Sequence, residues 1–307
     1  MKIYINISDD CTLACLHCYI QPRRSSVLDV STFLKWFNNC RKLIDEEIEI
    51  SFYGGEPLLQ ASNILKIIEN TKDNNITYKI VTNLVYDITP EIRDTLDMCS
   101  VSTSWDPPFV RFKNAYNYAL WRNNCKEITM SHVNIVMTKF LLEIEPKDLF
   151  CDCNAWGFNK IVFMWTNAEG NALINKQIPE AAALDDWLCK AYDIRPSTIV
   201  VNMFENLANA SLQTTLTGRS KFGDFVDISV GPDGIIIINS DKTSIYDPIE
   251  KLEHILVKQK ARKDVSLKCR TCSLYRYCFV NVKWLDTCPF PKKLFSKIVA
   301  DNNPKLL

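Results

Sequence analysis

The chain has 307 residues, with 36 Lys plus Arg balanced by 36 Asp plus Glu, so its formal net charge is zero. This balance, without a long run of either sign, disfavours a nucleic-acid or acidic-membrane partner. Asp9 and Asp10 interrupt the apolar start of the chain, and no segment approaches the roughly 18 unbroken apolar residues of a membrane span. We therefore expect a cytoplasmic protein.

Strand and helix patterns alternate along the first half of the chain. Amphipathic stretches such as 29–44, with Val30, Phe33, Leu34 and Phe37 on one face, predict helices. The predicted strands are 2–8, 47–53, 77–82, 100–105, 128–138 and 160–166, and the predicted helices are 29–44, 61–71, 90–98, 111–124 and one beginning near Pro146. Six successive strand–helix steps predict an α/β fold with a parallel sheet, a partial (β/α)6 TIM-type barrel rather than the complete eight.

The sequence predicts three parts. Residues 1–172 form the barrel core, 173–219 form a helical bridge, and 220–307 form a small extension with a β-hairpin at 225–239 and a final helix.

Thirteen cysteines are the most unusual feature of the composition. The cytosol keeps thiols reduced, so clustered cysteines there suggest metal ligands rather than disulfides. One group is Cys11, Cys15 and Cys18, and the other is Cys269, Cys272, Cys278 and Cys288. The remaining six are expected to be small buried residues: Cys40, Cys99, Cys125, Cys151, Cys153 and Cys189.

The first cysteine group follows the first predicted strand, and parallel sheets carry their chemistry at the carboxyl ends of strands. Three thiolates leave one coordination position open, as a catalytic metal site requires. A zinc site with His17 as fourth ligand is an alternative, but His17 is adjacent to Cys18 and cannot easily close the same tetrahedron. An iron–sulfur cluster fits the three cysteines better.

The segment "CTLACLHC" (11–18) resembles the CxxxCxxC signature of the radical S-adenosylmethionine (SAM) enzymes. The resemblance implies that the three cysteines hold a [4Fe–4S] cluster whose fourth iron is chelated by SAM. "FYGGEPLL" (52–59) resembles the GGEP motif of that family. It implies that Gly54, Gly55 and Glu56 lie at the amino-acid part of the cofactor, where the absence of a Cβ permits close approach.

Three later segments resemble the same family in the same order. They are "VTNLV" (81–85), with Leu84 in place of the usual Gly, "VSTSWD" (101–106) and "NAEGNA" (167–172). The resemblance implies that Asn83 and Ser104 contact the cofactor, and that His17 makes a backbone contact to the adenine. Taken singly, Thr82, Asn83, Ser104 and Asp106 read as turn or cap residues.

"CRTCSLYRYC" (269–278) and "TCPFPKKLF" (287–295) resemble the SPASM/twitch-like C-terminal domain that some radical SAM enzymes carry. The resemblance implies one auxiliary [4Fe–4S] cluster held by Cys269, Cys272, Cys278 and Cys288, and the alternative is a zinc ribbon. Val282 and Asn239 stand where a second auxiliary cluster would need cysteines, so we expect only one.

The resemblance implies reductive cleavage of SAM to a 5′-deoxyadenosyl radical that abstracts hydrogen from an unactivated carbon. We expect a ribosomal peptide as substrate, with oxidation, cross-linking or epimerisation as the outcome, and a reducing partner such as flavodoxin or ferredoxin. The alternatives are the same chemistry on a small molecule such as an amino sugar, or a non-catalytic metal-binding relative. Cys151 and Cys153 are weak candidates for a hydrogen donor, and the sequence identifies no catalytic base.

Overall fold

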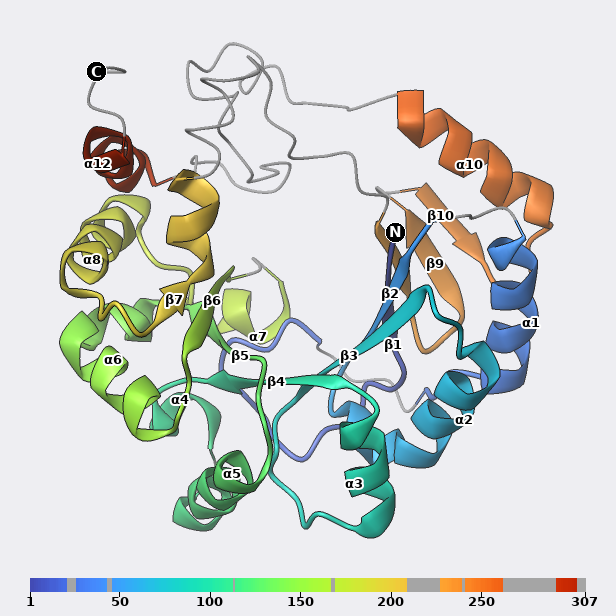
Figure 1. The fold of residues 1–307 in the computed structure, drawn as a ribbon, viewed down its shortest axis with the longest axis horizontal. Coiled ribbons are helices and arrows are strands. Elements are labelled where there is room, and N and C mark those ends of the chain that lie inside the picture. Colours follow the sequence, from blue (N-terminus) through green and yellow to red (C-terminus); the bar gives the residue numbers. More distant parts are fainter. Residues whose placement is uncertain are drawn as a thin grey trace.

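The computed structural model describes residues 1–20, 26–42, 46–112, 114–166, 169–208, 227–238, 241–261 and 291–302 (Figure 1). Its described strands form one sheet in the order β10-β9-β8-β1-β2-β3-β4-β5-β6-β7. The first six strands are β1 (Lys2–Asn6), β2 (Ile48–Tyr53), β3 (Ile76–Thr82), β4 (Ser100–Trp105), β5 (His132–Met137) and β6 (Lys160–Trp165). Each pairs in parallel with the next one in the chain.

Helices follow the first five of these strands and cover the outer face of the curved sheet (Figure 1). They are α1 (Val30–Arg41), α2 (Ala61–Thr71), α3 (Pro90–Asp97), α4 (Pro108–Arg111), α5 (Ala115–Glu127) and α6 (Pro146–Ala155). Short 3₁₀ turns precede α2 and α6, at Pro57–Gln60 and Lys139–Glu143. The predicted partial parallel barrel is confirmed.

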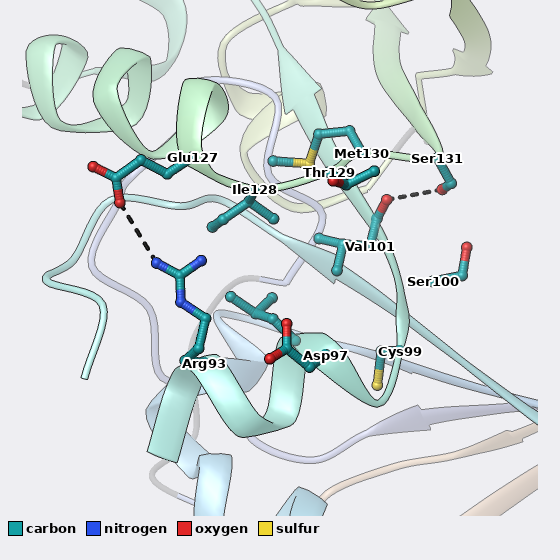
Figure 2. A pocket seen from close by; sticks show the side chains of 11 residues that line it. Arg93, Asp97, Cys99, Ser100, Val101, Glu127, Ile128, Thr129, Met130 and Ser131 are labelled. Atoms are coloured by element: carbon teal, nitrogen blue, oxygen red, sulfur yellow. Dashed lines mark hydrogen bonds and ion pairs between the residues drawn. The ribbon is translucent and has the colours of Figure 1, made fainter. Parts of the chain in front are cut away.

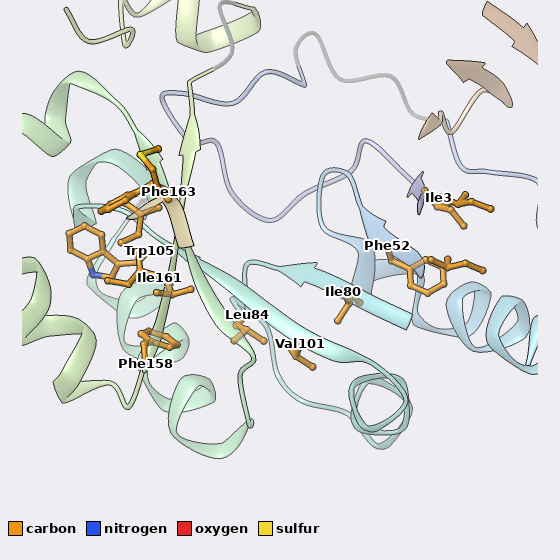
Figure 3. Packing of buried hydrophobic residues seen from close by; sticks show 14 of the residues in the cluster. Ile3, Phe52, Ile80, Leu84, Val101, Trp105, Phe158, Ile161 and Phe163 are labelled. Carbon is orange, nitrogen blue, oxygen red and sulfur yellow. The ribbon is translucent and has the colours of Figure 1, made fainter. Parts of the chain in front are cut away.

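Alternation along the strands builds the core between the sheet and the helices. Ile3, Ile80 and Ile161, on three different strands, have no exposed surface (Figure 3). Phe163 of β6 packs edge-on against Trp187 with ring centroids 5.8 Å apart. Burial of such side chains contributes about 1.5–3 kcal/mol each, which makes this layer the main source of stability.

Local capping sets the helix boundaries. The Asp29 carboxylate accepts the N–H groups of Ser31 and Thr32, so α1 begins at Val30. The predicted helix 111–124 is wrong in detail, because the chain forms α4 and then α5. The Asn114 side chain accepts the N–H of Asn117 and starts α5 afresh, an effect that the apolar pattern hides. The strand predicted at 128–138 begins only at His132.

The predicted bridge 173–219 is not purely helical. It is described as far as residue 208 and contains α8 (Ala181–Ile194) and the two-residue strand β7 (Val200–Val201), which pairs with β6. The short helix α7 (Gly170–Ile174) begins before it. The three predicted domain boundaries remain a prediction.

The predicted hairpin is present as β8 (Asp227–Val230) and β9 (Ile235–Ile238), and β10 (Asp241–Ser244) adds a third strand. β8 lies parallel to β1, so the hairpin extends the barrel sheet beyond its first strand instead of standing apart. After β10 come α10 (Ile249–Ala261) and α12 (Lys292–Asn302). The Asp185 carboxylate of α8 accepts the N–H groups of Lys293 and Leu294, which fixes the start of α12 against the barrel.

Within the described ranges, every helix is too short or too polar to cross a membrane.

Candidate functional site: the cysteine loop

The three cysteines of the first group lie in the loop that follows β1, and all three are partly buried. Burial raises the pKa of Cys15 to about 12, the Arg111 guanidinium partly opposes this, and the thiols of Cys11 and Cys18 raise it further. A buried thiolate here needs a compensating cation, which a bound metal supplies.

The double glycine after β2 holds the chain just before Cys11. The Gly55 N–H donates to the Ser8 carbonyl at 2.9 Å, and the Glu56 N–H donates to the Asp10 carbonyl at 2.7 Å. A Cβ on Gly55 would lie 2.2 Å from the Asp10 carbonyl oxygen, and Gly54 has φ +139°. The glycines are therefore required by the contact between two protein loops. Their predicted contact with the cofactor stays a prediction.

Glu56 joins the end of β2 to the end of β3. Its carboxylate is fully buried and accepts the Leu58 N–H at 3.2 Å, the Thr82 hydroxyl at 2.7 Å and the Asn83 N–H at 2.7 Å. Burial raises the pKa of Glu56 to about 7, although these hydrogen bonds favour the charged form. The structure thus shows a positioning role for Glu56 that sequence reasoning missed, and its predicted cofactor contact stays a prediction.

Asn83 reaches the cysteine loop directly. Its amide Nδ2 donates to the Cys11 sulfur at 3.4 Å and to the Thr12 hydroxyl at 3.1 Å, while Oδ1 accepts the Val85 N–H at 2.8 Å. The next residue, Leu84, adopts φ +54° with its side chain fully buried. The backbone therefore keeps the left-handed turn that a glycine would favour, although leucine occupies the position.

β4 contributes Ser104 and, just beyond its end, Asp106. Ser104 is half-buried beside Asn134 of β5, and its predicted contact with the cofactor stays a prediction. Asp106 is buried between Arg111 and His17, with one oxygen 2.6 Å from Arg111 Nη1 and the other 3.8 Å from His17 Nδ1. Burial lowers the pKa of His17, and Asp106 partly offsets this.

The other side of the cysteine loop is held by α7. Asn171 donates from its backbone N–H to the Cys18 carbonyl at 2.8 Å and from its side chain to the Cys15 carbonyl at 3.2 Å. Asn175 donates to the Leu16 carbonyl at 2.9 Å. Gly170, with φ +55°, leaves room for this approach, since a Cβ there would lie 2.8 Å from the Cys18 carbonyl oxygen. The sequence pattern did not single out the two asparagines.

This donor set suits a cluster better than a single ion. Among the described residues, no three His, Cys, Asp or Glu side chains are gathered as ligands of one metal ion would be. Thiolates on a four-iron cluster each bind a different iron, so they are spaced more widely than the ligands of one zinc ion. His17 is not part of any such group among those residues, so the zinc alternative with His17 as a fourth ligand gains no support from the described geometry.

The cysteines outside this loop divide into two sets. Cys269, Cys272, Cys278 and Cys288 lie outside the described residues, as do Val282 and Asn239, so the auxiliary cluster stays a prediction. Of the six dispersed cysteines, Cys40, Cys125 and Cys153 are buried as expected, whereas Cys151 is exposed. Cys151 and Cys153 lie on α6, outside the sheet, which does not support a role as hydrogen donor.

A separate cavity of about 370 Å³ lies at the opposite, amino-terminal ends of β4 and β5 (Figure 2). Its lining includes Cys99, Ser131 and the exposed ion pair between Arg93 and Glu127, whose nearest atoms are 3.5 Å apart. It is therefore distinct from the cysteine loop.

Comparisons with known proteins agree with the geometry. Residues 3–127 match the family model of a 4Fe-4S single cluster domain. The uncharacterized protein MJ0907 of Methanocaldococcus jannaschii is 34% identical over 85 residues, which are 26% of this chain and 29% of that protein. The chain therefore matches less than a third of the length of this curated relative.

Solved structures match over nearly the whole chain. The structure of anSMEcpe with bound AdoMet, from an anaerobic sulfatase-maturating radical SAM enzyme, has a TM-score of 0.76 at 15% identity and covers 99% of this chain and 98% of its own. The structure of Streptococcus suis SuiB bound to its precursor peptide SuiA has a TM-score of 0.61 at 14% identity. The match covers 90% of this chain and 70% of the SuiB chain. The chain therefore has the fold of the radical SAM enzymes, as the sequence predicts.

Proposed function

We propose that the protein is a radical SAM enzyme that modifies a peptide. Cys11, Cys15 and Cys18 would hold a [4Fe–4S] cluster with one iron left for SAM. When bound, the cluster and SAM supply a 5′-deoxyadenosyl radical that takes hydrogen from an unactivated carbon. The electron would come from a reductant such as flavodoxin or ferredoxin.

The observation that carries this proposal is the way the protein holds the loop of three thiols. The loop lies at the carboxyl end of β1 and is fixed on one side by Gly55 and Glu56 and on the other by Asn171 and Asn175. Carboxyl ends of parallel strands are where barrel enzymes bind their substrates. The match to a cluster domain over residues 3–127 and the AdoMet in anSMEcpe support the same two cofactors.

The residues around the loop supply positioning and shielding. Asn83 donates to the Cys11 sulfur, and its own backbone is held by Glu56. Partial burial of the three thiols limits access of water to the site. These contacts fix the cysteines before any cofactor binds, which lowers the entropic cost of assembling the site.

A peptide is the proposed substrate because of what the similar proteins bind. One structure of anSMEcpe contains AdoMet and the Kp18Cys peptide, with a TM-score of 0.72 at 16% identity. SuiB is bound to SuiA. The oxidation, cross-link or epimerisation expected from the sequence would follow hydrogen abstraction from such a peptide.

The test is anaerobic reconstitution with iron and sulfide, followed by reduction with dithionite in the presence of SAM. We expect brown protein that forms 5′-deoxyadenosine, and loss of that product in Cys15→Ala. Cys40→Ala removes a buried thiol on α1, away from the cysteine loop, and this variant should still form 5′-deoxyadenosine. Colourless protein that holds zinc and leaves SAM intact would favour a non-catalytic metal-binding relative. A short peptide encoded beside the gene should gain a mass change, whereas modification of an amino sugar alone would contradict the peptide assignment.

A further inference from the structure

A buried ion pair, between Asp106 and Arg111, lies next to the cysteine loop. Arg111 is 8% exposed and Asp106 is 1% exposed, and Arg111 Nη1 donates to Asp106 Oδ2 at 2.6 Å. From the sequence, Asp106 belongs to the segment "VSTSWD" that resembles the radical SAM family and, taken singly, reads as a turn or cap residue, whereas Arg111 was not singled out.

The pair is attached to the cysteine loop at two points. The Leu16 N–H, next to Cys15, donates to the carbonyl of Val110 at 3.1 Å. The imidazole of His17 lies 3.8 Å from the second Asp106 oxygen. The charge of Arg111 also acts on the thiols of Cys15 and Cys11. Arg111 therefore brings a fixed positive charge to the loop that would hold the cluster.

Stability alone does not explain this pair. Removing two charges from water costs several kcal/mol per ion, and apolar residues of similar volume often serve a core as well or better. Arg111 Nε, Asp106 Oδ1 and His17 Nδ1 are also buried without a hydrogen-bond partner among the described residues. Such a group calls for a role other than packing.

We propose that Asp106 positions Arg111 as a fixed positive charge against the cysteine-held cluster, and that this charge makes the cluster easier to reduce. The inference rests on the proposed function. One electron from a reductant adds one negative charge to the cluster, and a nearby buried cation stabilises that state more than the oxidised one. No bond forms or breaks in the protein during this step.

The test measures the midpoint potential of the first cluster without SAM, by dithionite titration followed by electron paramagnetic resonance. It uses protein in which the four C-terminal cysteines are changed to serine, so that one cluster is observed. Arg111→Met should lower the ratio of reduced to oxidised cluster at a fixed potential at least tenfold, which is about 59 mV for a one-electron couple. Arg111→Lys, which keeps the positive charge, should restore most of the ratio of reduced to oxidised cluster.

Asp106→Asn should shift the midpoint potential of the cluster in the opposite direction. Asparagine still accepts a hydrogen bond from Arg111 but removes a negative charge, so the potential should rise. A purely structural role would instead move both variants in the same direction, with parallel loss of iron, and that result would overturn the proposal. If Arg111→Met fails to bind iron, the shifts in midpoint potential of Arg111→Lys and Asp106→Asn decide whether Arg111 acts through its charge.

The matched control is Arg93→Met. Arg93 also pairs with a carboxylate, Glu127, but at the amino-terminal ends of the strands (Figure 2). The cluster in Arg93→Met should have the same midpoint potential as the cluster in the parent protein. Equal potentials in Arg111→Met, Asp106→Asn and the parent would refute the role of Arg111 and leave the proposed function standing. A parent protein that binds no iron–sulfur cluster would overturn both.

Discussion

The carboxylate of Glu56 accepts the backbone N–H of Asn83 at 2.7 Å, although the two residues are 27 positions apart in the chain. Asn83 in turn donates to the Cys11 sulfur at 3.4 Å. A single buried carboxylate thus couples the loop after β2 to a proposed cluster ligand after β1, through the end of β3. A substitution at Glu56 should therefore alter the position of the cysteine loop.

Glu56 should give the fold a specific pH dependence. Burial raises its pKa from 4.5 to about 7, so between these values the folded protein holds a proton that the unfolded chain has released. Its contribution to the free energy of unfolding therefore falls as pH rises through this window, by up to about 3 kcal/mol. The measurement is Tm from pH 5 to 7.5 for the wild type and Glu56→Gln.

The glutamine variant cannot titrate, so it supplies the reference. The Tm of the wild type relative to that of Glu56→Gln should fall as pH rises through the window. Parallel Tm curves would show that Glu56 keeps its ordinary pKa in the folded protein.

Gly55→Ala should displace the cysteine loop. The new Cβ would lie 2.2 Å from the Asp10 carbonyl oxygen, and relief of that overlap requires a shift of the backbone just before Cys11. We expect a loss of about 1–3 kcal/mol in unfolding free energy and of most of the reconstituted iron. The measurements are Tm and iron per chain.

Gly157→Ala is the matched control, at the end of α6. Gly157 has φ +77°, but a Cβ there meets no atom within 4 Å, so only backbone strain of about 1–2 kcal/mol applies. Iron content should stay at the wild-type value. Equal iron in the two variants would show that the glycine pair is not needed to hold the loop.

The sequence predicted the elements with strong periodicity and missed contacts that depend on the fold. The helix expected at 61–71 is found at Ala61–Thr71, because its apolar residues recur at helical spacing. By contrast, the roles of Glu56 and Asn171 depend on partners 27 and 156 positions away, which no local pattern reports. The break between α4 and α5 was missed because one capping residue, Asn114, sets the start of α5, where the weak apolar periodicity gives no boundary.

Leu84→Gly tests whether the leucine at a left-handed turn is tolerated for its packing. Glycine would relieve about 1–2 kcal/mol of strain at φ +54°. Loss of a fully buried leucine side chain costs more, about 2–5 kcal/mol for a change to alanine, and glycine adds backbone entropy. The variant should therefore be less stable, as measured by Tm.

Lys176→Gly provides the comparison at an exposed position. Lys176 has φ +51° and buries no side chain in the core, so its change to glycine should stay within about 1 kcal/mol of the wild type. A Leu84→Gly protein that is as stable as Lys176→Gly would mean that strain outweighs packing at this turn.

The C-terminal cysteines offer the last prediction. If Cys269, Cys272, Cys278 and Cys288 hold an auxiliary cluster, the reconstituted wild type should contain about eight irons per chain, and the variant with all four changed to serine about four. Because Cys11, Cys15 and Cys18 are held by contacts from Gly55, Asn83 and Asn171, the first cluster should remain and should still cleave SAM. The measurements are iron, zinc and 5′-deoxyadenosine per chain. A wild type with about four irons and one zinc, and a serine variant that loses only the zinc, would instead identify the C-terminal group as a zinc ribbon.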